Sequence, residues 1–173
     1  LAREASELSA QLHPVVRLSV ADLVRSMNCY YSNLIEGHNT HPRDIDRALA
    51  ADYSSDPHRR DLQLEARAHI EVQRMIDERA GDLPRPPVAR AFIEWAHREF
   101  YRRLPESLLV VVNPDTAERV PVVPGQLRTH TVAVGRHVAP ASQDLPSFLG
   151  RFEEAYDASR LTKPRQVIAV AAA

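Results

Sequence analysis

The sequence is poor in the features that mark secreted and membrane proteins. Cys29 is its single cysteine among 173 residues, which excludes an internal disulfide and favours a reducing compartment. No apolar run approaches the roughly 18 residues of a membrane-spanning helix. The first residues also lack the basic start, apolar middle and small-residue cleavage site of a signal peptide. We therefore predict a soluble, cytoplasmic protein with no membrane partner.

The sequence also lacks a strong net charge. Its 22 Lys and Arg residues almost balance its 23 Asp and Glu residues, for a formal net charge of −1. This balance argues against a dedicated nucleic-acid binder, and in particular against a helix-turn-helix regulator. The apolar fraction of 44% and the charged fraction of 26% are ordinary for a globular protein, and this length supports one good core.

Apolar residues at helical spacing predict a mainly α fold. A long helix beginning at Pro14 and ending at Gly37 would bury a stripe formed by Val16, Val20, Leu23, Val24, Met27, Tyr31, Leu34 and Ile35. Further helices are predicted over residues 42–50, 61–80, 86–103 and 142–156, with a last one opened by Thr162 and Pro164. Trp95 and Phe100 are predicted to lie in the core.

A small β region is predicted between the helices. Residues 108–112 and 119–123 are β-branched runs on either side of the turn signal Asn113-Pro114-Asp115. Residues 129–136 alternate polar and apolar side chains, as a half-exposed strand does.

The second half of the first long helix has an unusual polar face. Residues 26–33 carry no formal charge, and Ser32 and Glu36 share a face with Asn28 and Cys29, opposite the apolar stripe. We therefore expect this face to point away from the core of its own unit. A small, polar, uncharged face that ends in one acid favours a specific contact over a solvated surface.

Two segments resemble parts of a known family. The first is Ser32-Asn33-Leu34-Ile35-Glu36-Gly37, and the second is Pro124-Gly125-Gln126-Leu127-Arg128 followed by Val132-Ala133-Val134-Gly135-Arg136-His137. From about Pro14 to Ala173 the chain resembles the Fic family, protein adenylyltransferases that move AMP from ATP to a protein hydroxyl. The first segment is similar to the family's inhibitory-helix pattern and the second to its flap. The resemblance implies a Fic-like helical bundle with a small β-hairpin flap.

The resemblance divides the chain and assigns roles to its residues. Residues 1–60 would form the inhibitory-helix region, and residues 61–173 the N-terminal part of the Fic domain, including the flap. The inhibitory residues would be Ser32, Glu36 and Gly37. ATP would lie beside Val134, Gly135, Arg136 and His137, and a protein substrate would dock on Arg128, Thr129, His130, Thr131 and Val132. The implied cofactors are ATP and Mg²⁺, and a homo-oligomer is left open.

One departure from the family is plain. The family's catalytic signature (histidine, proline, phenylalanine, two variable residues, then Gly-Asn-Gly-Arg) is absent, since no Gly-Asn-Gly occurs in the sequence. The catalytic histidine and the magnesium ligand therefore have no counterpart here. The apolar run over residues 167–173 has no stop signal, so we expect the natural polypeptide to continue. The alternative is a non-catalytic relative.

Plainer interpretations stand beside these assignments. Glu36 would be a surface acid in the last turn of a helix, and the flap a surface hairpin with its edge blunted by Arg128, His130 and Arg136. The whole chain would then be a non-enzymatic interaction module that presents this edge. His38 and His41 suggest a metal site, but no third ligand has convincing spacing. A buried polar seam or a wet helix face is formed by Glu65, His69 and Gln73.

Overall fold

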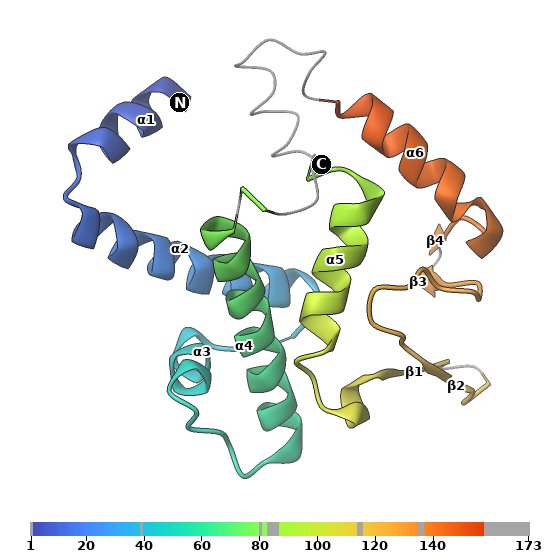
Figure 1. Ribbon diagram of the computed structural model, residues 1–173. Helices are drawn as coiled ribbons and strands as arrows, with labels where there is room; N and C mark the ends of the chain where they lie inside the picture. The colour runs from blue at the N-terminus through green and yellow to red at the C-terminus, as the bar shows by residue number, and fades with distance from the viewer. Residues whose placement is uncertain are drawn as a thin grey trace. The chain divides into compact units, whose positions relative to one another are not determined.

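The computed structural model describes residues 2–38, 40–79, 81–82, 87–113, 116–134 and 137–157. It is mainly α, with short antiparallel hairpins in its second half (Figure 1). The chain divides into two compact units, residues 1–80 and residues 81–173. The division after residue 60 that the resemblance implies falls inside a helix of the first unit. None of the described helices is both long and apolar enough to cross a membrane.

Where the structure describes it, the first unit contains four helices, α1 (Ala2–Gln11), α2 (Pro14–Ile35), α3 (Pro42–Leu49) and α4 (Pro57–Glu78). A proline begins each of the last three, at a position where the missing N–H has no helical partner to lose. The sequence predicted α2 and α3 closely. It placed the start of α4 too late, because the Asp56 carboxylate accepts a 2.8 Å hydrogen bond from the Arg59 N–H and caps the helix there. No helix was predicted over the residues of α1.

The core of the first unit lies where α2, α3 and α4 meet. It contains Cys29, Ile45, Ala66 and Ile70, each at most 1% exposed, and Tyr30 packs against them. Cys29 comes from the polar face of α2. The expectation that this face points away from the core was therefore wrong for Cys29, whereas Asn28, Ser32 and Glu36 are exposed as expected.

The apolar stripe of α2 is not the buried face. Its members at both ends and in the middle are exposed, from 44% to 83%: Val16, Val20, Leu23, Val24, Tyr31, Leu34 and Ile35. Small side chains allow α2 to approach α4 closely through Cys29, whose thiol donates to the Ala66 carbonyl across 3.7 Å. Helical spacing identifies an apolar face, but it does not identify which neighbouring element covers it.

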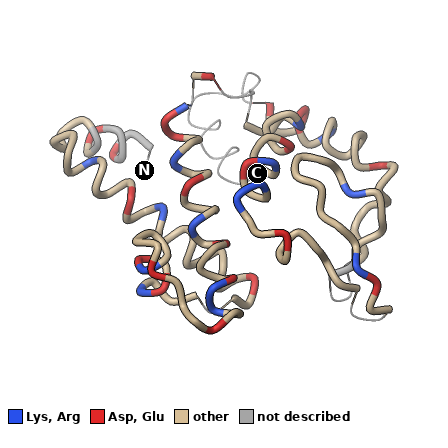
Figure 2. The backbone as a smooth tube through the Cα atoms, turned by 60° about the horizontal axis from the view of Figure 1, so that its bottom comes forward, with Lys and Arg blue, Asp and Glu red and all other residues tan. Residues whose placement is uncertain are grey.

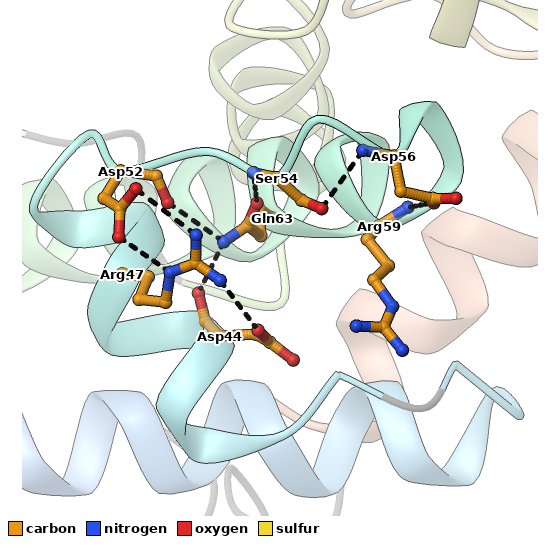
Figure 3. Close-up of polar contacts among 7 residues, drawn as sticks. All are labelled: Asp44, Arg47, Asp52, Ser54, Asp56, Arg59 and Gln63. Carbon is orange, nitrogen blue, oxygen red and sulfur yellow. Dashed lines mark hydrogen bonds and ion pairs between the residues drawn. The ribbon is translucent and has the colours of Figure 1, made fainter.

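A polar network fixes the connection between α3 and α4 (Figure 3). The side chain of Gln63 is 1% exposed, and its Oε1 accepts from the Ser54 N–H across 2.7 Å. Its Nε2 donates to the carbonyls of Asp44 and Asp52, at 3.3 Å each. Buried amide groups need such partners, so Gln63 holds the loop against α4.

The described residues of the second unit form two helices and two hairpins. It contains α5 (Arg90–Tyr101), β1 (Val110–Val112), β2 (Arg119–Pro121), β3 (Ala133–Val134), β4 (His137–Val138) and α6 (Leu145–Ala155). Short 3-10 helices precede β1 and α6. The strands pair antiparallel, Val111 with Val120 and Val134 with His137. Along the described chain, basic and acidic residues are interspersed (Figure 2).

The predicted β runs were confirmed in kind but were too long. Of the strand expected over residues 129–136, only β3 is a strand; residues 129 and 130 form a bend, and the chain returns at once as β4. Trp95 and Phe100 are half-buried. The helix predicted from Thr162 and Pro164 lies outside the described residues.

Candidate functional site

The C-terminal end of α2 presents Glu36 on a tightly built turn. Gly37 follows it with a φ of +80°, the left-handed conformation predicted for its stop. The Gly37 N–H donates to the Leu34 carbonyl across 3.2 Å, and the His38 N–H donates to the Asn33 carbonyl across 2.7 Å. This pair of bonds is the Schellman arrangement, which satisfies the last carbonyls of a helix. The backbone of Glu36 is thereby held from both sides.

The side chains of Ser32 and Glu36 are both exposed. Among the described residues, neither the Glu36 carboxylate nor the Ser32 hydroxyl has a hydrogen-bond or ion-pair partner. The helix dipole places partial negative charge at this end of α2, so an unpaired carboxylate is disfavoured there. A cationic group that approached Glu36 would relieve that repulsion.

Two side-chain contacts hold the turn after α2 against its neighbours. The Asn33 amide donates to the Thr40 hydroxyl across 3.2 Å, and Thr40 is only 2% exposed. One residue after Gly37, His38 Nδ1 lies 3.4 Å from Glu65 Oε2 on α4. Burial raises the pKa of the Glu65 carboxyl, and His38 opposes part of that rise. The end of α2 is therefore joined both to the start of α3 and to α4.

The polar residues predicted as a seam on α4 are half-buried. Glu65 meets His38, and the His69 and Gln73 side chains lie 2.5 Å apart at their ring and amide nitrogens. Burial lowers the pKa of His69, which favours the neutral imidazole. These residues are therefore neither a fully buried seam nor a fully solvated helix face.

Cys29 lies beside this seam and is chemically protected. Burial, followed by the nearby Glu65 charge, raises the pKa of the Cys29 thiol to about 12. A thiol of that pKa stays protonated near neutral pH, and the thiolate is the reactive form. Cys29 is a packing residue and not a nucleophile.

A cavity of about 380 Å³ with a mixed polar and apolar lining lies next to Gly37. His38 and His41 both line it, together with His58 and Arg59 from the start of α4. No group of three possible metal-ligating side chains occurs among the residues that the structure describes. The metal site considered for His38 and His41 therefore has no third ligand among the described residues.

The hairpin of β3 and β4 is the segment that resembles the flap. It is extended by a 2.9 Å hydrogen bond from the Ala139 N–H to the Val132 carbonyl. The Arg128 guanidinium donates to the His130 carbonyl across 2.6 Å and also to the Pro140 carbonyl. Arg128 thus holds the two ends of the hairpin together. The Ser142 hydroxyl adds a 3.1 Å bond to the Thr129 carbonyl.

The expected nucleotide neighbours are described only in part. Val134 and His137 pair with each other in β3 and β4, while Gly135 and Arg136 lie outside the described residues. Thr129 and Thr131 are exposed and His130 and Val132 are half-buried. The flap assignment therefore rests on the backbone of the hairpin.

The turn before the hairpin is held by α5, which sequence reasoning missed. The Gly125 N–H donates to His97 Nδ1 across 2.8 Å, so the ring proton of a neutral His97 sits on Nε2. Burial lowers the pKa of His97 and favours that neutral form. Gly125 has a φ of +81°, and a Cβ there would lie 2.7 Å from Arg98 Nε and 3.2 Å from the Glu94 carbonyl. No local pattern links a helix residue to a glycine so far along the chain.

An apolar groove of about 350 Å³ runs beneath this turn, lined by His97, Tyr101, Val111, Leu127 and Val132 among others. It lies within the second unit, whereas Glu36 lies within the first.

No family model matches this chain, and no curated protein and no solved structure matches it either.

Proposed function

We propose that this chain is the inhibitory-helix and flap portion of a bacterial-type Fic protein adenylyltransferase, held inactive through Glu36. The observation that carries the proposal is the position of Glu36. It caps α2 on a rigid turn, and its exposed carboxylate has no partner among the described residues. The order of the resembling segments along the chain supports the same assignment.

The inhibition would work by competition for one arginine. In the proposed enzyme, the arginine of the catalytic signature holds the γ-phosphate of ATP. A carboxylate and a guanidinium form a bidentate pair through the same donors that a phosphate uses. Glu36 would occupy that arginine, so ATP would bind in a pose unsuited to in-line attack on its α-phosphorus. Ser32, one helical turn earlier, would steady the arrangement by hydrogen bonding.

The transfer itself requires the signature that this sequence lacks. The target hydroxyl would attack the α-phosphorus, its proton would pass to the signature histidine, and pyrophosphate would leave. Mg²⁺ would bind through the same signature and the ATP phosphates. The proposal therefore requires that the complete polypeptide supply these residues.

The hairpin of β3 and β4 would align the target. An extended segment can add to a strand edge through main-chain hydrogen bonds, which demand little of its sequence. Arg128 supports this role because it fixes the base of the hairpin from inside. The edge would then be presented with a fixed direction, and a tyrosine, threonine or serine of the target would reach the α-phosphate.

Replacing Glu36 tests the proposal. In the complete protein with ATP labelled at the α-phosphate, Glu36→Gly is expected to raise auto-adenylylation by at least about tenfold, because one charge-assisted pair of about 1.5–3 kcal/mol is lost. Glu78→Gly is the matched control, because Glu78 is also an exposed acid at the C-terminal end of a helix. Equal activity of Glu36→Gly and the wild-type protein, with ATP still bound, would contradict the proposal.

A second function is favoured by the exposed apolar stripe of α2. Contiguous apolar surface on a single protein commonly marks a protein-binding site. The chain would then be a non-enzymatic interaction module or a catalytically dead relative. This alternative predicts no transfer of label in any variant, whereas the enzyme predicts label on the protein in the presence of Mg²⁺.

A further inference from the structure

The turn that carries Glu36 is joined to α4 through one side-chain contact. His38 Nδ1 lies 3.4 Å from Glu65 Oε2, and His38 is the second residue after Glu36. Glu65 directly precedes Ala66, whose carbonyl accepts the Cys29 thiol of α2. The contact therefore lies beside the packed core of the unit, so a movement of α4 would reach the turn directly.

The same histidine also closes the helix end. Its N–H donates to the Asn33 carbonyl across 2.7 Å, the bond that completes the Schellman arrangement. A displacement of His38 would break that bond and free the φ and ψ angles of Gly37. Because glycine populates many conformations, the turn that borders Glu36 would then no longer be held in one arrangement.

The environment of Glu65 points to a positional role for its carboxylate. Its side chain is 26% exposed. Burial raises the pKa of its carboxyl, so partial burial opposes the ionised form. The charges that act on it are those of His38 and His58, which lower its pKa, and Asp61, which raises it. A half-buried acid of this kind contributes little net stability, so its replacement should leave the unit folded.

We propose that Glu65 and His38 form a positioning pair that aims Glu36 by holding the turn after α2 against α4. The inhibitory consequence rests on the proposed function, but the positional consequence does not. Glu65 would thus regulate adenylylation without touching ATP or the target. It would do so by fixing where the Glu36 carboxylate points.

Amide hydrogen exchange in the 173-residue chain tests the positional part. Glu65→Ala is expected to raise exchange at the Gly37 and His38 amides by about two- to fivefold, the range for a partly exposed ion pair. Glu65→Gln keeps an acceptor for His38 and should retain most of the protection. Glu71→Ala is the control, because Glu71 lies on the same helix and pairs with Arg67.

Two results would overturn this part. One is unchanged exchange at Gly37 and His38 in Glu65→Ala. The other is a rise spread evenly along α2, which would show lost stability in place of lost position.

Auto-adenylylation of the complete protein tests the regulatory part. Glu65→Ala is expected to raise activity by about two- to fivefold, less than Glu36→Gly, since the inhibitory acid remains. If Glu36→Gly activates and Glu65→Ala does not, the regulatory role is wrong and the proposed function stands. If Glu36→Gly does not activate, the proposed function fails, and amide exchange still decides the positional role.

Discussion

At the scale of single residues, Cys29 and Glu36 lie in opposite surroundings on one helix: the Cys29 thiol is buried against α4, while the Glu36 carboxylate is exposed after the last turn of α2. The stop at Gly37 was read correctly because a left-handed residue after a helix is a local requirement, visible in the sequence itself. Burial depends on tertiary packing, and it is burial that raises the pKa of both Cys29 and Glu65. Neither residue carries a local sign that α4 or α2 will cover it. The same holds for His97, which meets a glycine from a distant turn.

The Cys29 thiol is expected to resist alkylation in the folded protein. Because its pKa is raised from 9.0 to about 12, thiolate should be about a thousandfold rarer than for an ordinary cysteine at the same pH. Iodoacetamide at about pH 8, followed by mass spectrometry of the intact chain, measures the rate. The guanidinium-unfolded chain is the control. A native rate within about tenfold of the unfolded rate would contradict the burial of Cys29.

At the scale of elements, periodicity predicted where helices lie but not which face of α2 is covered. The stripe from Val16 to Ile35 has the spacing of a core face and is exposed. Cys29 packs against α4 because its side chain is small and its thiol reaches the Ala66 carbonyl, and the half-buried Asn33 has Thr40 as a hydrogen-bond partner. Satisfied polar groups can be buried at little cost, and hydrophobic spacing alone does not detect them. The strands were shorter than expected because a 3-10 helix takes up Leu108, a bend takes up Leu109, and a second bend takes up Thr129 and His130.

Two glycine turns should differ in their tolerance of alanine. A Cβ at Gly37 would meet no atom within 4 Å, so Gly37→Ala should cost only the left-handed strain of roughly 1–2 kcal/mol in the free energy of unfolding. Gly125→Ala should cost about 1–3 kcal/mol more, because its Cβ would press on Arg98 and on the Glu94 carbonyl. Urea unfolding of the two variants measures both. Equal costs would contradict the close packing of the Gly125 turn against α5.

At the scale of the whole molecule, the chain consists of two units that carry different parts of the proposed machinery. The first unit has its own core and presents Glu36, and the second carries the hairpin that would align a target. The mainly α class and the small β hairpins were predictable from spacing and turn signals. The Fic function remains a proposal, because it depends on a catalytic signature that this sequence does not contain.

The central claim is that Glu36 occupies an arginine that would otherwise hold ATP. The most direct test is the distance from the Glu36 carboxylate oxygens to the guanidinium nitrogens of the signature arginine, in a crystal structure of the complete protein without nucleotide. We expect a bidentate pair at about 2.7–2.9 Å. A Glu36 carboxylate that remains solvent-exposed, with the signature ordered and its arginine elsewhere, would contradict the account.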